Sequence, residues 1–216
     1  MTIRVEALCT GLPAPFNGAE LSAIDKRPVD GPVMIRSFGL EGDMVADTKH
    51  HGGEDMAVHH YPHDHYGGWG VWLGGGHGLL SRPAAFGENV HATGLVETDV
   101  HIGDRFRLGN ALLEVSQPRK PCWKIDHRFG HKGMVARIVK QHNCGWYYRV
   151  IEEGSAQAGD MLERVETGYR DWTVARLFSK FYDPAHRANA AQWREIAALE
   201  KLSPKLRDQA RTAAER

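Results

Sequence analysis

The chain has 216 residues, of which 42% are hydrophobic and 25% charged, values typical of a globular protein that buries a core in one large domain or in one domain with a small appendage. Its formal net charge of zero argues against a protein that coats nucleic acid through bulk electrostatics. Three cysteines, no signal-peptide pattern and no apolar run near the roughly 20 residues that span a bilayer predict a reduced, cytoplasmic protein with no membrane partner.

Short β-like runs broken by glycine and proline occupy the chain to about residue 167. They are 3–8, 31–35, 55–61, 88–94, 104–117 and 145–154. The longest run predicts a hairpin, because Gly109 and Asn110 tolerate the positive φ of a tight turn between alternating segments. Many short strands at this spacing indicate a closed or nearly closed β-barrel. Helices are expected at 62–72, where Pro62 suits a first helical position, and at 132–141, where apolar residues share one face.

From residue 168 onward the pattern is helical. Apolar side chains recur at helical spacing at Val174, Leu177, Phe178, Phe181 and Tyr182. Asp183 and Ser203 each precede a proline, as at a helix start, and Asn189 with Gln192 matches a capping box. The predicted fold is therefore mainly β with added helices: a β-barrel domain, 1–167, followed by a small all-α subdomain, 168–216.

Cys122 lies in the most basic and most rigid loop of the chain, SQPRKPCWK. Pro118 and Pro121 fix their own φ and push the residues before them towards extended conformations. Positive charges near the thiol favour the thiolate, a nucleophile or a soft-metal ligand; they belong to Arg119, Lys120 and Lys124. Cys9 and Cys144, in or beside apolar strand-like runs, are expected to be buried core residues.

A second feature is the stretch 39–66, rich in histidine and glycine. Lysine, imidazole and glycine N–H groups close together suit an anion such as phosphate; the side chains concerned are Lys49, His50, His51, His59 and His60. Zinc is a rival ligand, but the spacing matches no tetrahedral finger pattern. Adjacent strand residues point to opposite faces, so at most one of His59 and His60 can face a given pocket. In a third segment, 82–95, Glu88 and Asn89 alone would be interpreted as turn caps.

These segments, in this order, resemble the MOSC domain, named after the C-terminal domain of molybdenum cofactor sulfurase, and more closely its YiiM-like branch. The resemblance spans almost the whole chain, and it is carried by KRPVDGPV (26–33), GLEGD (39–43), KHHGGEDMAVHHYP (49–62), FGENV (86–90) and PRKPCWK (118–124). The tail, TGYRDWTVARLFSKFYDP, is similar to the three-helix extension of that branch. Met56 and Asp25 depart from the family pattern.

The resemblance implies a MOSC-type β-barrel that holds a molybdopterin-type molybdenum cofactor, with Cys122 as the protein's ligand to molybdenum. Thiolate ligation and nearby cations suit such a metal centre and the phosphate of its pterin. Matching positions imply a set of residues that line the cofactor or substrate pocket: Lys26, Lys49, His50, His59, His60, Glu88, Asn89, Arg119 and Lys124. Asp43 and His60 are the candidates for delivering protons. At the level of the whole family, pyridoxal phosphate binding is a further association.

The branch is linked to detoxification of N-hydroxylated purine and pyrimidine bases such as hydroxylaminopurine. The resemblance therefore implies an oxidoreductase whose cofactor supplies the redox chemistry, with the amine and water as products. Its expected partners are a small-molecule N-hydroxylated substrate and an electron-donor reductase, and a homodimer is a further expectation.

Three other functions stay open at this point. The chain could carry molybdenum cofactor or sulfur to another enzyme without turnover. It could be a cysteine-dependent hydrolase or transferase that pairs Cys122 with His127 or a distant histidine. The basic tail could contact nucleic acid as a helix-turn-helix. Because Ser203 and Pro204 look like ordinary capping and the basic excess is modest, we expect the tail to dock on the barrel, on a dimer mate or on an electron donor.

Overall fold

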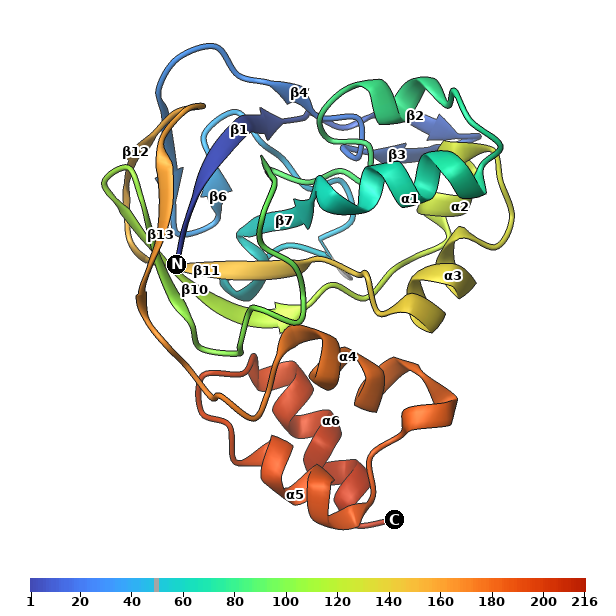
Figure 1. Ribbon diagram of the computed structural model, residues 1–216, viewed down its shortest axis with the longest axis vertical. Coiled ribbons are helices and arrows are strands. Elements are labelled where there is room, and N and C mark those ends of the chain that lie inside the picture. The colour runs from blue at the N-terminus through green and yellow to red at the C-terminus, as the bar shows by residue number, and fades with distance from the viewer. Residues whose placement is uncertain (49–50) are drawn as a thin grey trace.

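The structure is a computed structural model that describes residues 1–48 and 51–216. It consists of a β-barrel with helices beside it and a helical tail below it (Figure 1). The strands are β1 (Thr2–Thr10), β2 (Ala14–Asn17), β3 (Glu20–Ser22), β4 (Arg27–Pro28), β5 (Val33–Arg36), β6 (Gly39–Leu40), β7 (Val58–Pro62), β8 (Val90–Ala92), β9 (Arg105–Leu108), β10 (Ala111–Pro118), β11 (Trp146–Glu152), β12 (Gly154–Ala156) and β13 (Met161–Glu166). The helices are α1 (Asp64–Trp72), α2 (Lys124–Phe129), α3 (Met134–Gln141), α4 (Val174–Tyr182), α5 (Ala190–Ala197) and α6 (Pro204–Ala214), with 3-10 turns η1 (Glu54–Met56), η2 (Gly78–Ser81) and η3 (Pro184–His186).

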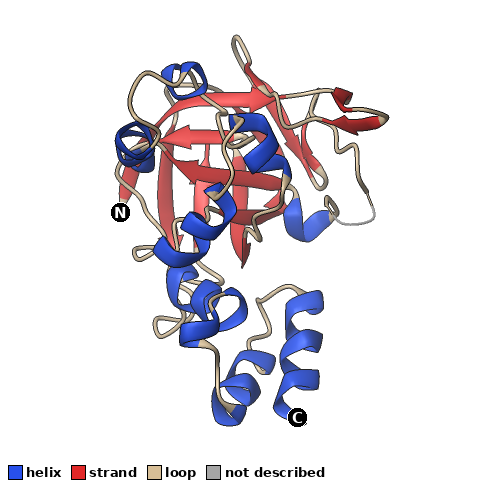
Figure 2. Cartoon of the chain, turned by 90° about the vertical axis from the view of Figure 1, so that its right-hand side faces the viewer, coloured by secondary structure: helices blue, strands red, loops and turns tan. Residues whose placement is uncertain are grey.

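Seven strands of the described chain close into a barrel, in the order β13, β9, β10, β11, β7, β8 and β1. Closure comes from the antiparallel pairing of β1 with β13, while β4 extends the sheet beyond β1. Strands β7 and β8 pair in parallel. The remaining strands form a smaller sheet of β12, β5 and β6 and the β2–β3 hairpin. Figure 2 shows the strands of the barrel with helices around them. The predicted fold class, a β-barrel with added helices, is confirmed.

The predicted hairpin is β9 and β10, paired in antiparallel register from Ala111–Leu108 to Glu114–Arg105. Gly109 adopts a φ of 55°, and a Cβ atom there would lie 2.3 Å from the Ser155 carbonyl oxygen, so only glycine fits this turn. Every residue of β10 is buried. Burial on both faces follows because α4 packs against the strand from outside the barrel. The strand thus delivers its last residue, Pro118, and the cysteine loop at a fixed position.

The helix predicted at 62–72 begins later than expected. Pro62 is the last residue of β7, paired with Ala92 of β8, and α1 starts at Asp64. The prediction that Pro62 opens the helix is wrong, because an extended proline at the end of a strand satisfies the same φ. The helix expected at 132–141 is confirmed as α3, which buries Met134 and Ile138. Helix α2, six residues long, was not predicted.

The tail, residues 168–216, holds α4, α5 and α6 below the barrel (Figure 1). Its buried side chains, among them Phe178 and Trp193, belong to the same hydrophobic cluster as the barrel core. The capping box of α5 at Asn189 is confirmed, and Pro204 opens α6 as predicted, but the Ser203 side chain caps nothing. Instead the Ser203 N–H donates to the Ser116 carbonyl of β10 at 3.0 Å, which fastens the tail to the barrel. Among the described helices none is long and apolar enough to cross a bilayer.

Candidate functional site

Two cavities meet at the cysteine loop. The inner cavity, about 540 Å³, lies between the loop that follows β6 and the segment that precedes β8. The outer cavity, about 800 Å³, lies between the cysteine loop and the tail. Residues that line both cavities are Ala46, Asp47, His51, Met56, Cys122, Lys124 and Tyr147. A half-buried free cysteine thus stands where a deep pocket opens into a wider groove.

The loop that carries Cys122 is held at both ends by backbone contacts. Pro118 pairs with Trp146 of β11, and the Arg119 N–H donates to the Gly145 carbonyl at 3.0 Å. On the far side the Cys122 carbonyl accepts from the Ile125 N–H at 3.0 Å, at the start of α2. The thiol is therefore positioned by a strand on one side and a helix on the other, as the two prolines predicted.

Cys9 and Cys144 are buried, as expected for core residues. Burial raises the pKa of the Cys9 thiol to about 12. It also raises the pKa of Cys144 well above its ordinary value. Neither thiol lines the inner or the outer cavity.

Arg119 and His59 present buried nitrogen atoms to the inner cavity. Arg119 Nη1 and His59 Nε2 have no hydrogen-bond partner among the described residues. Burial, with the positive charge of Arg119 as a second cause, lowers the pKa of His59 well below its ordinary value, so this imidazole is neutral at neutral pH. A buried donor without a partner costs about 1–3 kcal/mol. A polar or anionic ligand in the cavity would remove that cost.

Lys26, Asp43 and Asn89 form the polar wall of the inner cavity. The Lys26 ammonium pairs with the Asp43 carboxylate. That carboxylate also accepts from the Gly11 N–H and from the Asn89 side-chain amide, each at 2.8 Å. The Asn89 amide oxygen accepts from the His59 N–H at 3.0 Å. Burial lowers the pKa of Lys26 against the opposing effect of Asp43. These contacts let Asp43 position the wall, and its role as a proton donor stays a prediction.

Glu88 is fully buried and lines neither cavity, which corrects its predicted place in the cofactor pocket. Its carboxylate accepts from the Ala84 N–H at 2.9 Å, from the Phe86 N–H at 3.1 Å and from the Tyr66 hydroxyl. Turn capping, the ordinary interpretation of such a residue, explains it. The capped segment leads to Gly87, which lines the cavity with a φ of 78°.

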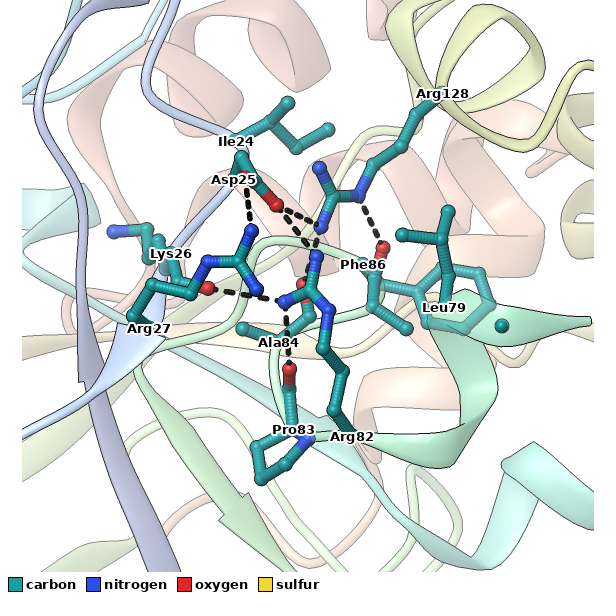
Figure 3. Close-up of polar contacts among 12 residues, drawn as sticks. Ile24, Asp25, Lys26, Arg27, Leu79, Arg82, Pro83, Ala84, Phe86 and Arg128 are labelled. Carbon is teal, nitrogen blue, oxygen red and sulfur yellow. Dashed lines mark hydrogen bonds and ion pairs between the residues drawn. The ribbon is translucent and has the colours of Figure 1, made fainter.

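Asp25, between the cavity-lining residues Ile24 and Lys26, holds three arginines together (Figure 3). Its carboxylate accepts from Arg82 at 2.6 Å, Arg27 at 2.8 Å and Arg128 at 2.9 Å. Arg128 also donates to the Ala85 carbonyl at 2.8 Å. Partial burial opposes ionisation, but the hydrogen bonds from Arg82 and Arg128 prevail and lower the pKa of Asp25 to about 2. The cluster ties α2 and the segment before β8 to the segment that carries Lys26.

His60 lies outside both cavities, contrary to the prediction. Its ring packs at a tilt of 31° against Trp146, with 4.3 Å between centroids, and its Nδ1 is 3.2 Å from the Tyr148 hydroxyl. Burial lowers the pKa of His60 to about 3, which leaves it neutral and unsuited to deliver protons. Because strand side chains alternate, His59 faces the cavity and His60 the barrel interior. Lys49 and His50 lie outside the described residues.

The outer cavity brings in residues that sequence reasoning missed. Tyr182 of α4 and Lys205 of α6 line it, beside Lys120, which was predicted as one of the cations near the thiol. Tyr147 of β11 lines both cavities. No local pattern marks these side chains, because the groove forms only when the tail packs below the loop.

The proposed pairing of Cys122 with His127 finds no support in the contacts. His127 Nε2 lies 3.1 Å from the Phe16 carbonyl oxygen, and its ring packs edge-on against Phe16. Within residues 1–48 and 51–216, no imidazole forms a hydrogen bond with the Cys122 thiol.

Comparison with known proteins places related sequences over nearly the whole chain. The family model described as MOSC domain matches residues 47–163. Protein YiiM of Escherichia coli is 37% identical over 210 residues, which cover 92% of this chain and 93% of YiiM. The uncharacterized protein YflK of Bacillus subtilis is 40% identical over 191 residues, 87% of this chain and 80% of YflK. A protein of Gibberella moniliformis named Reductase is 38% identical over 163 residues, 75% of this chain but 29% of its own length.

Solved structures agree with the sequence matches. The crystal structure of YiiM from Geobacillus stearothermophilus superposes with a TM-score of 0.82 at 31% identity, over 98% of this chain and 99% of that one. The structure of YiiM from Escherichia coli gives a TM-score of 0.82 at 30% identity, over 100% of this chain and 93% of that one.

Proposed function

Because the chain belongs to the MOSC domain family, in the branch that contains YiiM, we propose that it is a molybdenum-cofactor-dependent reductase of N-hydroxylated compounds. An oxidoreductase-type role agrees with the relative named Reductase. One observation carries the finer proposal. The half-buried Cys122 thiol stands where the inner cavity, with its unpartnered buried donors, opens into the outer cavity.

The inner cavity suits a phosphorylated pterin cofactor in size and in chemistry. Its volume of about 540 Å³ falls in the range of small-molecule and cofactor sites. Arg119 Nη1, a donor, and His59 Nε2, a ring nitrogen, have no partners among the described residues, and polar or anionic groups of a cofactor would supply them. Cys122 is the residue that would ligate molybdenum, since thiolates bind such metals and this one is held rigidly.

When bound, this cofactor supplies two-electron redox chemistry. Reduction of an N–OH group breaks the N–O bond with two electrons and two protons, and gives the N–H group and water. We assign the electrons to an electron-donor reductase and the protons to a side chain that lines the cavities. His51 lines both of them, and it replaces His60 as the imidazole for this role. The residues that position the wall, Asp43 and Asn89, orient the donors around the bound group.

Replacement of the thiol tests the proposal directly. Wild-type protein and Cys122→Ser, both made in a cell that synthesises the cofactor, are assayed for reduction of hydroxylaminopurine with a chemical reductant, so that no partner protein is needed. We expect turnover to fall by about a hundredfold or more while the melting temperature stays the same, because the thiol is a metal ligand on the surface of a cavity. Cys9→Ala, which removes a buried thiol outside the cavities, is the matched control and should retain turnover.

Two results would contradict the reductase. Retained turnover in a molybdenum-loaded Cys122→Ser protein would remove the thiol from the mechanism. Bound molybdenum without any turnover of N-hydroxylated compounds under chemical reduction would identify the chain as a cofactor carrier.

A further inference from the structure

We propose that the outer cavity is a nucleotide-binding groove, and that the substrate is an N-hydroxylated base carried on a phosphorylated sugar. This inference rests on the proposed function and specifies its substrate class. The groove, about 800 Å³, begins at Cys122 and Tyr147 and ends on the tail. A base with its sugar and phosphate falls within the size range that such sites accept.

The groove is built by three separate parts of the chain. One wall is the cysteine loop with Lys120, Cys122 and Trp123, and a second is the β2–β3 hairpin with Leu21. The third wall is the tail, where Tyr182 of α4 and residues of the first turns of α6 line the cavity. Figure 1 shows α4 directly below the end of β10 from which the cysteine loop departs, with α6 farther below. The tail therefore forms part of the site.

Two lysines, Lys120 of the cysteine loop and Lys205 of the tail, can hold a phosphate in the groove. Within residues 1–48 and 51–216, no carboxylate forms an ion pair with Lys120 or Lys205. The Lys120 ammonium lies 5.9 Å from the centre of the Tyr182 ring, so it points towards the tail. A third lysine is engaged elsewhere, since Lys124 donates to the Leu21 carbonyl at 3.2 Å and lies 4.0 Å from the Glu20 carboxylate.

The placement of Lys205 points to an anion at this end of the groove. Lys205 is in the first turn of α6, which contains no acidic residue. Cations are unfavourable at a helix N-terminus, where the dipole is positive. An anionic group bound between Lys205 and Lys120 would offset both the dipole and the two charges.

Aromatic rings beside the thiol suit a planar base. Trp123, next to Cys122 in sequence, lines the groove with 45% of its surface exposed. Tyr147 lines the groove beside the thiol as well. Stacking on such rings accepts any base because every base has a π-face. Together these groups recognise a nucleotide: the rings of Trp123 and Tyr147 for the modified base, and Lys120 with Lys205 of the tail for its phosphate.

Acidic side chains limit the length of the ligand. Glu20 and Asp47 line the same groove as the lysines. A long polyanion would place phosphates beside these carboxylates, which is unfavourable, whereas a single nucleotide needs only the tail end. We therefore assign the groove to a mononucleotide.

The test is calorimetric titration of the full-length protein with adenosine 5′-phosphate, adenosine and inorganic phosphate at low ionic strength. We expect the nucleotide to bind about tenfold or more tightly than the nucleoside, because charge-assisted hydrogen bonds add to stacking. In Lys120→Ala/Lys205→Ala the ratio of the two Kd values should approach one while the Kd of adenosine stays the same. Arg211→Ala, which removes a cation of α6 outside the groove, is the matched control and should keep the ratio.

Equal affinities for adenosine and its 5′-phosphate would overturn the inference. So would inorganic phosphate binding as tightly as the nucleotide, because the rings would then add nothing. A parallel assay separates this result from the fate of the proposed function. If the protein reduces an N-hydroxylated base no better as its nucleotide, the proposed reductase function stands and the proposed nucleotide groove is wrong. If the protein binds the nucleotide through the two lysines but reduces neither the base nor its nucleotide, the nucleotide groove stands and the proposed reductase function is wrong.

Discussion

At the scale of single residues, buried polar contacts shape the inner cavity. Asp43 joins Lys26 to Asn89, and Glu88 caps the segment that leads to the cavity wall. Arg119 and His59, by contrast, are left with nitrogen atoms that nothing described completes. The satisfied groups hold the wall, and these two unpartnered nitrogen atoms belong to residues that line the cavity, as in a site prepared for a polar ligand.

Asp25 provides a pH-dependent prediction. Its pKa in the folded chain, about 2, is below its ordinary value of 3.8, so its ionised form stabilises the fold above about pH 4, and this contribution is lost as the pH falls towards 2. We expect Asp25→Asn to lower the melting temperature at pH 7 and to differ little from the wild type at pH 2. Thermal unfolding at pH 7, 4 and 2 measures this. Asp30→Asn, at an exposed acid nearby, is the control. If the wild type still melts at a higher temperature than Asp25→Asn at pH 2, the stabilisation does not come from the ionised Asp25 carboxylate.

Arg119 should show opposite effects on stability and on cofactor binding. Arg119→Met removes a buried donor without a partner, so cofactor-free protein should be as stable as the wild type or more stable. The same change removes a ligand for the anionic cofactor, so retained molybdenum should fall by about tenfold. Melting curves of cofactor-free protein and elemental analysis of loaded protein test the two effects. Loss of stability with unchanged molybdenum would mean that Arg119 is structural.

The residue scale also shows where local sequence is informative. Two prolines and three cations around Cys122 indicated a rigid functional loop, and these features act through near neighbours in the chain. Strand alternation predicted that His59 and His60 point to opposite faces of the strand. It could not tell which of the two points to the cavity, because that depends on which face of β7 lines it. The correct choice, His59, is fixed by pairing with β11 and β8, which local sequence does not contain.

At the scale of elements, the β9–β10 hairpin and the loop after it form one rigid unit. Gly109 makes the turn, the buried strand β10 follows, and Pro118 passes directly into the cysteine loop. The hairpin was predictable because Gly-Asn between alternating segments has a local physical meaning. Helix α2 was not predictable, because six residues are too few to show a helical period. Pro62 was assigned to a helix start, but its φ suits the end of a strand equally well.

The turn of this hairpin can be tested with a matched pair of glycines. At Gly109, alanine would have to adopt a φ of 55° and place its Cβ 2.3 Å from the Ser155 carbonyl oxygen. We expect Gly109→Ala to lower the free energy of unfolding by at least about 2 kcal/mol. Gly31→Ala has a similar positive φ of 77° but meets no atom within 4 Å, so it should cost only about 1 kcal/mol. Urea denaturation measures both losses. If the two variants lose the same free energy of unfolding, the contact between the new Cβ atom and the Ser155 carbonyl oxygen does not destabilise the fold.

At the scale of the whole molecule, barrel and tail share one hydrophobic core. Leu177 and Phe178 of α4 belong to the same cluster as Leu113 and Val115 of β10. The change from β-like to helical pattern near residue 168 was visible in the sequence because periodicity is local. The outer cavity between the cysteine loop and the tail was not visible in the sequence. Its walls come from residues far apart in the chain, such as Leu21, Tyr147 and Lys205.

A continuous core should make the molecule unfold as one unit. We expect a single cooperative transition, with far-ultraviolet circular dichroism and tryptophan fluorescence coinciding in urea. Removal of residues 168–216 should prevent the barrel from folding, because the outer face of β10 would lose its apolar cover. Two separate transitions, or a folded barrel after proteolytic loss of the tail, would contradict this and would support the division into domains at residue 167.

The most direct test of the central claim is the molybdenum content of the protein purified from a cell that makes the cofactor. If the Cys122 thiol ligates molybdenum above a cavity that holds its pterin, the wild type should contain about one molybdenum atom per chain at full loading and Cys122→Ser far less, with Cys9→Ala equal to the wild type. Wild-type protein without molybdenum, or equal molybdenum in the wild type and Cys122→Ser, would contradict it.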